Sequence, residues 1–149
     1  MPFGVNLFTY PLQPSPLMLN QLTIRNYVLV DHLDIGFAPG LTGITGESGA
    51  GKSILLGALS LLMGERARTD SVRPGADKAD VSAEFALRKD SALHQKLLTD
   101  ELIEADDDCC LVRRVVSAEG RSKAFINNVP VTVNYLKEAT EHLVDIQEL

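Results

Sequence analysis

Apolar and polar residues alternate in several short stretches of the chain, a pattern typical of β-strands with one buried face. In residues 79–87, Val81, Ala83, Phe85 and Leu87 fall on one face. The same reasoning predicts strands at 19–26, within 27–37, at 110–116 and at 123–126. The segment 41–45 is short and rich in apolar and β-branched residues, and we expect a further strand there.

Three stretches have helical rather than alternating character. Residues 54–63 are apolar with no breaker before Gly64, which predicts a buried helix. Residues 91–102 carry leucines at helical spacing, with Asp90 or Ser91 as the N-cap. A third helix is expected after Thr132 as its cap, and residues 143–146 then begin another strand. Glu119-Gly120 and Asn127-Asn128 are expected to form turns.

The connection between the strand at 41–45 and the helix at 54–63 reads G-x-x-x-x-G-K-S. Small residues let backbone N–H groups turn toward phosphate oxygens, and the start of a helix adds further donors and a positive dipole end. This is the phosphate-binding P-loop in its strand–loop–helix context. The cofactor-binding residues are therefore expected to be Gly46, Glu47, Ser48, Gly49, Ala50, Gly51, Lys52 and Ser53.

Two P-loop side chains have specific expected roles. Lys52 supplies a mobile cation for the β- and γ-phosphates of ATP and is the candidate catalytic residue. The Ser53 hydroxyl is the candidate Mg²⁺ ligand. The motif thus predicts an α/β P-loop NTPase with ATP and Mg²⁺ as cofactors.

A P-loop ATPase also needs an apolar strand ending in Asp, which holds Mg²⁺ and polarises the attacking water. Residues 27–31 have suitable letters but precede the P-loop, and we interpret them as an ordinary strand. Residues 97–101 lie on a helical pattern. Neither fits the role, so the sequence predicts the N-terminal part of a longer ATPase.

Charge and cysteine content restrict the partners. The net charge is −6, and residues 90–149 carry the whole excess with twelve acidic and six basic residues. This is not a basic nucleic-acid footprint. No apolar run is long enough for a membrane span. The adjacent Cys109 and Cys110 form no metal spacing, and we expect buried or half-buried strand thiols in a reduced cytoplasmic protein.

Other chemistry-bearing residues have plain interpretations. Arg66, Arg68 and Arg73 are expected in a solvated loop, with Arg73 the best placed of them to reach phosphate or DNA. The acidic residues of 100–108 are interpreted as an exposed loop rather than a cation site. Surface or capping roles are expected for His32, His94 and His142, and a core position for Tyr27.

Two longer stretches, 18–27 and 34–53, resemble the start of an SMC-type ATPase head, in particular that of the RecN family of bacterial DNA double-strand-break repair proteins. The segments 64–68, 72–75, 120–128 and 130–132 support the resemblance, and the Arg-Ser-Lys-Ala-Phe-Ile-Asn run is its most specific part. The resemblance covers residues 18 to about 146.

The resemblance implies an ABC-type head of two lobes, separated in sequence by a coiled coil. It implies that ATP lies between two heads of a homodimer, that the C-terminal lobe supplies the signature and Asp-Glu strand, and that the dimer acts on DNA at the nucleoid. This chain would be the N-terminal lobe, with a mixed β-sheet and a P-loop helix. It departs from the family at 147–149, where Gln147 does not match the family's metal-reaching glutamine.

The expected domains are a non-native or disordered leader at 1–17, rich in proline and without pattern, and the lobe at 18–149, ending before the coiled coil. Rival functions stay open at this point. A small-molecule kinase would need a lid with arginines, a GTPase would need Asn-Lys-x-Asp, and a stand-alone nucleotide-binding module would need neither.

Overall fold

Within the described part of the chain, six strands form an antiparallel sheet in the order β2-β1-β3-β4-β5-β6. The computed structural model describes residues 17–36 and 49–141. The strands are β1 (Leu17–Tyr27), β2 (Val30–Gly36), β3 (Lys78–Leu87), β4 (Cys109–Ser117), β5 (Ser122–Ile126) and β6 (Val129–Val131). The helices are α2 (Gly49–Leu62), the 3-10 turn η1 (Thr69–Ser71), α3 (Ala92–Thr99) and α4 (Val133–Thr140).

The alternation of apolar residues explains how each strand is buried. In β3 every second residue from Ala79 to Leu87 is buried, and in β4 every second residue from Cys110 to Val116. β1 departs from strict alternation, since Leu19 and Leu22 are both buried. A bulge at Asn20 inserts one residue between the pairs Leu19–Phe85 and Gln21–Glu84 and restores the phase.

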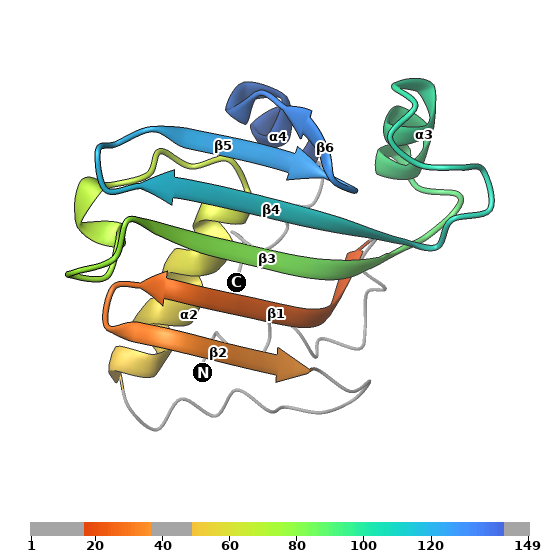
Figure 1. Cartoon of the computed structure of the whole chain (residues 1–149). Coiled ribbons are helices and arrows are strands. Elements are labelled where there is room, and N and C mark those ends of the chain that lie inside the picture. Colours follow the sequence, from red (N-terminus) through yellow and green to blue (C-terminus); the bar gives the residue numbers. More distant parts are fainter. Residues whose placement is uncertain (1–16, 37–48, 142–149) are drawn as a thin grey trace.

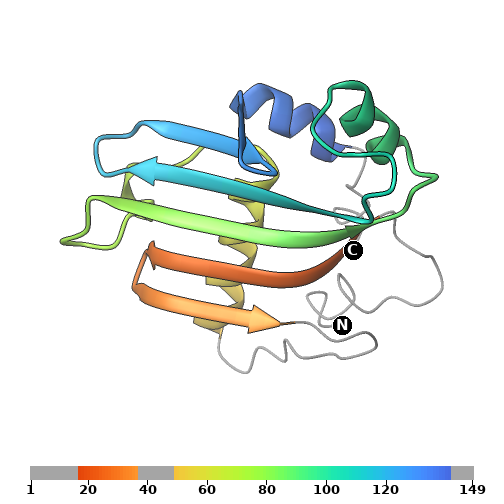
Figure 2. The ribbon, with the colours of Figure 1, turned by 45° about the vertical axis from the view of Figure 1, so that its right-hand side comes forward.

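Helix α2 crosses one face of this sheet, and the opposite face carries no described helix (Figures 1 and 2). α4 lies beside β5 and contacts α3, near the edge of the sheet that β6 forms (Figure 1). The buried core therefore lies between α2 and the inner face of the sheet, and it includes Leu22, Ile24, Leu62, Val81 and Val116.

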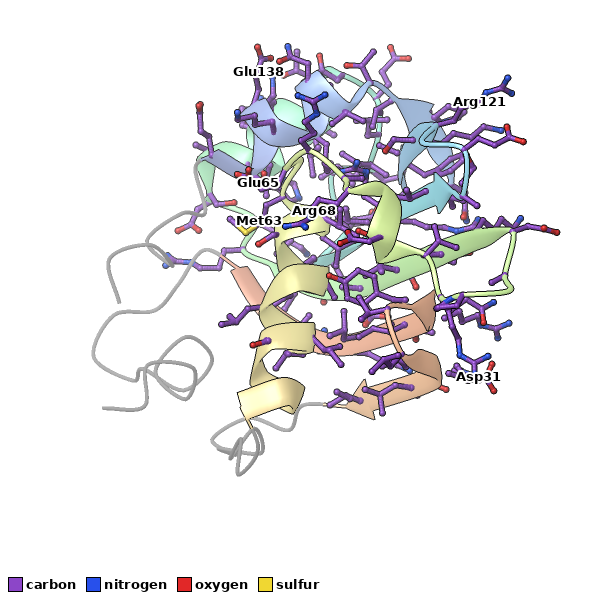
Figure 3. All side chains as sticks on the ribbon, turned by 90° about the vertical axis from the view of Figure 1, so that its left-hand side faces the viewer. Asp31, Met63, Glu65, Arg68, Arg121 and Glu138 are labelled. Carbon is purple, nitrogen blue, oxygen red and sulfur yellow. The ribbon has the colours of Figure 1, made fainter. Side chains whose placement is uncertain are left out.

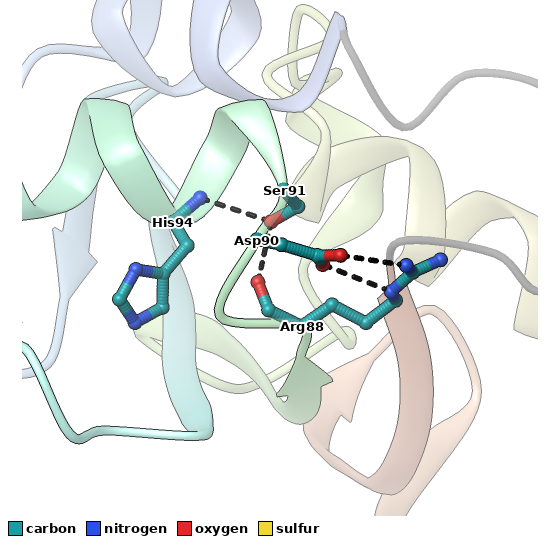
Figure 4. Close-up of polar contacts among 4 residues, drawn as sticks. All are labelled: Arg88, Asp90, Ser91 and His94. Carbon is teal, nitrogen blue, oxygen red and sulfur yellow. Dashed lines mark hydrogen bonds and ion pairs between the residues drawn. The ribbon is translucent and has the colours of Figure 1, made fainter.

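The short helices begin at side-chain caps. The Ser91 hydroxyl accepts a hydrogen bond of 3.1 Å from the His94 N–H and donates one of 2.7 Å to the Arg88 carbonyl (Figure 4). Arg88 in turn pairs with Asp90 at 3.0 Å. The Thr132 hydroxyl caps α4 through the Tyr135 N–H at 2.9 Å. Ser91, rather than Asp90, is thus the cap of α3, and the Thr132 prediction is confirmed.

Turn residues account for two differences from the sequence-based expectations. Residues 27–31 are not one strand, because Val28 and Leu29 form the turn of the β1–β2 hairpin and Val28 has a φ of 55°. α3 ends at Thr99 rather than at 102, because Glu101 has a φ of 62°, which no helix continues. The turn at Asn127-Asn128 is confirmed, with φ angles of 52° and 68°.

The remaining predictions of secondary structure are confirmed for the strands near 19–26, 30–36, 79–87, 110–116 and 123–126 and for the helix at 54–63. β6 was not expected from the sequence. The predicted strands at 41–45 and 143–146 lie outside the described residues. β1 begins at Leu17, one residue before the predicted start of the domain.

Candidate functional site

The described part of the P-loop motif is the start of helix α2, residues 49–53. Gly46, Glu47 and Ser48 lie outside the described residues, and the helix begins at Gly49. The first turn of α2 is therefore formed by the motif's last residues, while the side chains from Gly49 to Lys52 lie outside what the structure describes. Ser53 follows in the helix and is exposed. The loop-to-helix context that the motif requires is thus met on its helical side.

The inner side of α2 is packed on the sheet through Leu55, Ala58, Leu59 and Leu62, all at most 7% exposed. A β-carbon on Gly57 would lie 2.3 Å from the Tyr27 hydroxyl oxygen, so glycine leaves room for this ring at the end of β1. Tyr27 is itself 7% exposed, and burial together with the charge of Asp70 raises its pKa. Its predicted core position is confirmed.

α2 ends in a glycine-capped turn. Gly64 has a φ of 88°, its N–H donates to the Leu61 carbonyl at 3.1 Å, and the Glu65 N–H donates to the Ser60 carbonyl at 3.1 Å. These two bonds are the Schellman motif, in which glycine in the left-handed conformation satisfies the last helical carbonyls. The chain thereby leaves the helix in a defined direction.

A buried arginine of the sheet also binds this helix end. Arg114 of β4 is 1% exposed, and its Nη1 donates to the carbonyls of Leu61 at 2.7 Å and Glu65 at 3.0 Å. Its Nε and Nη2 donate to the Ser122 hydroxyl of β5. Burial lowers the pKa of this guanidinium. A cation at the C-terminal end of a helix faces the negative end of the helix dipole.

α4 closes on the same end of α2. The Thr140 hydroxyl donates to the Met63 carbonyl at 3.0 Å, and a β-carbon on Gly64 would lie 2.6 Å from the backbone of Lys137. Figure 3 shows Met63 and Glu65 at the end of α2 nearest α4, on which Glu138 is labelled. The sheet, α4 and the glycine turn therefore fix the C-terminal end of α2 together.

The loop after α2 is solvated, as expected. Arg66 is exposed, and Arg68 forms a 3.1 Å pair with Asp70 in which both side chains are mostly exposed. Arg73 lies 3.8 Å from Asp31 of the β1–β2 hairpin. Exposed pairs of this kind contribute little stability. Among the described residues, these three arginines do not contact a common partner.

Among the described residues, no cluster of His, Cys, Asp and Glu could hold a metal ion. The burial of the histidines and cysteines tests the predictions made for them. His32 is at the surface beside Asp34, whereas His94 is buried, which the sequence-based expectation missed, and a 3.0 Å hydrogen bond joins its Nε2 to the Asp107 carbonyl oxygen. His142 lies outside the described residues. Cys110 is buried, but Cys109 is exposed, so the expectation was wrong for that thiol.

Several residues of the motif run 120–128 have structural roles. Ser122 accepts from Arg114, while Ala124 and Ile126 are buried under the sheet. The Asn127 side chain accepts from the Leu111 N–H at 2.9 Å and donates to the Leu102 carbonyl at 2.8 Å. Sequence reasoning missed Arg114, although the alternation of β4 places position 114 on the buried face with Val112 and Val116.

No described helix is long and apolar enough to cross a membrane. A family model described as AAA domain matches residues 21–148. The chain is 46% identical over 130 residues to the DNA repair protein RecN of Haemophilus influenzae, and 36% identical over 129 residues to RecN of Bacillus subtilis. Each alignment covers 87% of this chain, but the chain spans only 23% and 22% of those relatives.

The fold has counterparts among solved structures. A structure from a study of ATP-driven dimerization and DNA-stimulated activation of SMC ATPases has a TM-score of 0.63 at 20% identity, covering 85% of this chain and 79% of that one. The recombination mediator RecF has a TM-score of 0.60 at 17% identity, covering 82% of this chain and 30% of that one. These likenesses confirm the predicted fold class.

The similarity to RecN predicted from the sequence is likewise confirmed. The family model, the sequence relatives and the solved structures match nearly the same residues of this chain. Those residues contain the whole P-loop motif and the buried contacts at the end of its helix. The chain belongs to the AAA domain family and has the P-loop NTPase fold of the N-terminal lobe of an SMC-type ATPase head.

Proposed function

We propose that this chain binds Mg·ATP through residues 46–53. The observation that carries the proposal is that the G-x-x-x-x-G-K-S sequence runs directly into the first turn of α2, a helix that is packed against the sheet between Leu55 and Leu62. Helix N-termini following such loops bind phosphate through backbone N–H groups and the helix dipole.

In this proposal each motif residue has a role. The backbone of Gly46, Glu47, Ser48, Gly49, Ala50 and Gly51 surrounds the phosphates. Lys52 lies against the β- and γ-phosphates, and the Ser53 hydroxyl ligates Mg²⁺. The exposure of Ser53 in α2 is compatible with that role, since a metal ligand must be reachable from outside the core.

The chain acts as one lobe of a larger ATPase. Because it spans about a quarter of its RecN relatives, the rest of the machinery lies in the other parts of such a protein. In our proposal the chain is the N-terminal lobe of a homodimeric, RecN-type ATPase that hydrolyses ATP between two heads. The whole protein acts in DNA double-strand-break repair and recombination, in the cytoplasm at the nucleoid. The names of the RecN and SMC relatives support this assignment.

A calorimetric titration with Mg·ATP tests the binding proposal. We expect the wild-type chain to bind and Lys52→Ala to bind at least about tenfold more weakly, because the substitution removes the cation facing the phosphates. Lys123→Ala, an exposed lysine of β5, is the matched control and is expected to bind like the wild type. Equal affinity of wild type and Lys52→Ala would refute the proposed site.

A phosphate-release assay tests the division of labour between the lobes. The isolated chain is expected to hydrolyse ATP negligibly, because catalysis of phosphoryl transfer depends on several charged groups arranged around the γ-phosphate. Robust release that Lys52→Ala abolishes would show instead that this lobe holds a complete catalytic centre.

A further inference from the structure

Arg114 is a buried cation whose described partners are all neutral. It is 1% exposed and among the largest fully buried side chains, and it donates to two backbone carbonyls and one hydroxyl. No ion pair involves it among the described residues. Burying a charge without a carboxylate partner is costly, so hydrogen bonds to Arg114 must compensate for its lost hydration.

The hydrogen-bond partners of Arg114 explain why a charged side chain is buried at this position. One terminal nitrogen, Nη1, reaches carbonyls on both sides of the end of α2, Leu61 inside the helix and Glu65 beyond the glycine turn. The other side of the same guanidinium is held by Ser122 on the next strand. Arginine's planar fork can hold three oxygens in fixed directions, whereas a lysine ammonium is a point charge on a flexible stem.

A fixed C-terminal end controls the position of the whole helix. α2 has 14 residues, so it is about 20 Å long, and a tilt of about 5° at one end would move the other end by about 2 Å. Displacements of about 1 Å are enough to impair a binding or catalytic site. The contacts at Leu61 and Glu65 therefore bear on where the first turn of α2, from Gly49, is placed.

We infer that Arg114 is a positioning residue for the phosphate-binding end of α2: by holding the helix's C-terminal end to β4 and β5, it sets where the N-terminal turn meets a nucleotide. This inference rests on the proposed function, because it presumes that the nucleotide binds at that turn. Arg114 touches no nucleotide in this account. Its effect on binding is transmitted through the helix.

The test combines hydrogen exchange without nucleotide and calorimetric titration with Mg·ATP, on the full 149-residue chain. Arg114→Met removes the guanidinium and keeps an apolar stem, and Arg114→Lys keeps the charge without the fork. Arg113→Met is the matched control, because Arg113 is the adjacent residue on the same strand and binds Asp80 instead of α2. Circular dichroism melts establish that each variant folds.

We expect the Gly64 and Glu65 amides of Arg114→Met to exchange roughly tenfold faster and its Mg·ATP affinity to fall by about tenfold. Arg114→Lys should lie between Arg114→Met and the wild type in both measurements, and Arg113→Met should match the wild type. If Arg114→Met does not fold, Arg114→Lys and Ser122→Ala carry the test, with smaller changes in the same direction.

Two results would overturn the inference while leaving the proposed function intact. One is unchanged exchange at Gly64 and Glu65 in the folded variants, and the other is faster exchange with an unchanged Mg·ATP affinity. A wild-type chain that binds no Mg·ATP would overturn the proposed function, and with it the presumed link to the nucleotide, whereas the exchange data would still show whether Arg114 holds the helix end.

Discussion

Two adjacent arginines of β4 show how differently the two faces of the sheet use the same side chain. Arg113 points to the outer face, where its guanidinium forms hydrogen bonds of 2.6–3.2 Å to the Asp80 carboxylate and lies 5.4 Å from the Phe125 ring centre. Arg114 points to the inner face, and its partners among the described residues are all neutral oxygens. The side chain of Arg113 is 38% exposed, and Arg114 is 1% exposed.

The pKa values of the two guanidinium groups move in opposite directions, and the causes differ. Hydrogen bonding to Asp80 raises the pKa of Arg113, whereas burial lowers that of Arg114. An arginine near solvent with a carboxylate partner gains from its charge, but a buried one must be repaid by hydrogen bonds and the helix dipole. The inner arginine therefore holds structural elements in position, whereas the outer arginine adds a modest electrostatic stabilisation at the surface.

The largest expected effect comes from removing the inner arginine. Arg114→Met should lower the free energy of unfolding by roughly 2–4 kcal/mol, because the Leu61 and Glu65 carbonyls and the Ser122 hydroxyl lose a charged donor. Relief of the buried charge opposes this loss only in part. Urea denaturation of wild type and variant gives the difference. A variant as stable as the wild type would mean that the hydrogen bonds of Arg114 merely balance its desolvation.

The glycine turn at the same helix end comes next. Gly64→Ala should cost about 2–3 kcal/mol, because alanine is strained at a φ of 88° and its β-carbon would meet the Lys137 backbone at 2.6 Å. Gly75→Ala is the control: its φ is 91° but nothing lies within 4 Å, so strain alone should cost about 1 kcal/mol. Equal losses in the two variants would show that the contact between α2 and α4 contributes nothing.

The outer arginine should have a smaller effect. Arg113→Met is expected to cost less than about 1 kcal/mol, and this cost should shrink as salt is added, because the pair with Asp80 is partly exposed. Urea melts at low and high salt measure both quantities. A loss as large as that of Arg114→Met would erase the distinction between the two faces.

The smallest expected effect concerns the adjacent cysteines, of which Cys110 is buried and Cys109 is exposed. Burial raises the pKa of Cys110 to about 12, whereas partial desolvation together with the charges of Glu84, Asp108 and Asp107 raises the pKa of the exposed Cys109. Iodoacetamide at pH 8 should therefore modify Cys109 slowly and Cys110 only after denaturation, since the thiolate is the reactive form. Cys109 labelling should accelerate as the pH rises. Mass spectrometry of the labelled chain distinguishes the two sites, and prompt labelling of Cys110 in the folded chain would contradict its burial.

The sequence was sufficient for most of the local structure. Alternation located β3 and β4, Gly64 ended α2, and Thr132 capped α4 as predicted. It failed at residues 27–31, where apolar letters suggested a strand but the chain turns through Val28 at positive φ. β-branched residues rarely adopt that conformation, so no propensity rule would have placed the turn there.

The candidate site likewise has a part that could be predicted from the sequence and a part that could not. The P-loop residues are predicted from spacing alone, because each position has a chemical reason that is local in sequence, and their binding role stays a prediction. The contacts of Arg114 with Leu61 and Glu65 could not be predicted, since they join residues 53 and 49 positions apart. An arginine at an inward position of β4 was nevertheless visible in the alternation, and such a mismatch deserves a search for buried acceptors.

The most direct measurement of the central claim is a hydrogen-exchange footprint of the wild-type chain with and without Mg·ATP. We expect the nucleotide to slow exchange at the P-loop and the first turn of α2, residues 46–53, and to leave exchange at the outer-face strand residues around Arg113 unchanged. Protection centred on any other part of the chain, or none at a concentration that saturates calorimetric binding, would contradict the claim that this helix end is the nucleotide site.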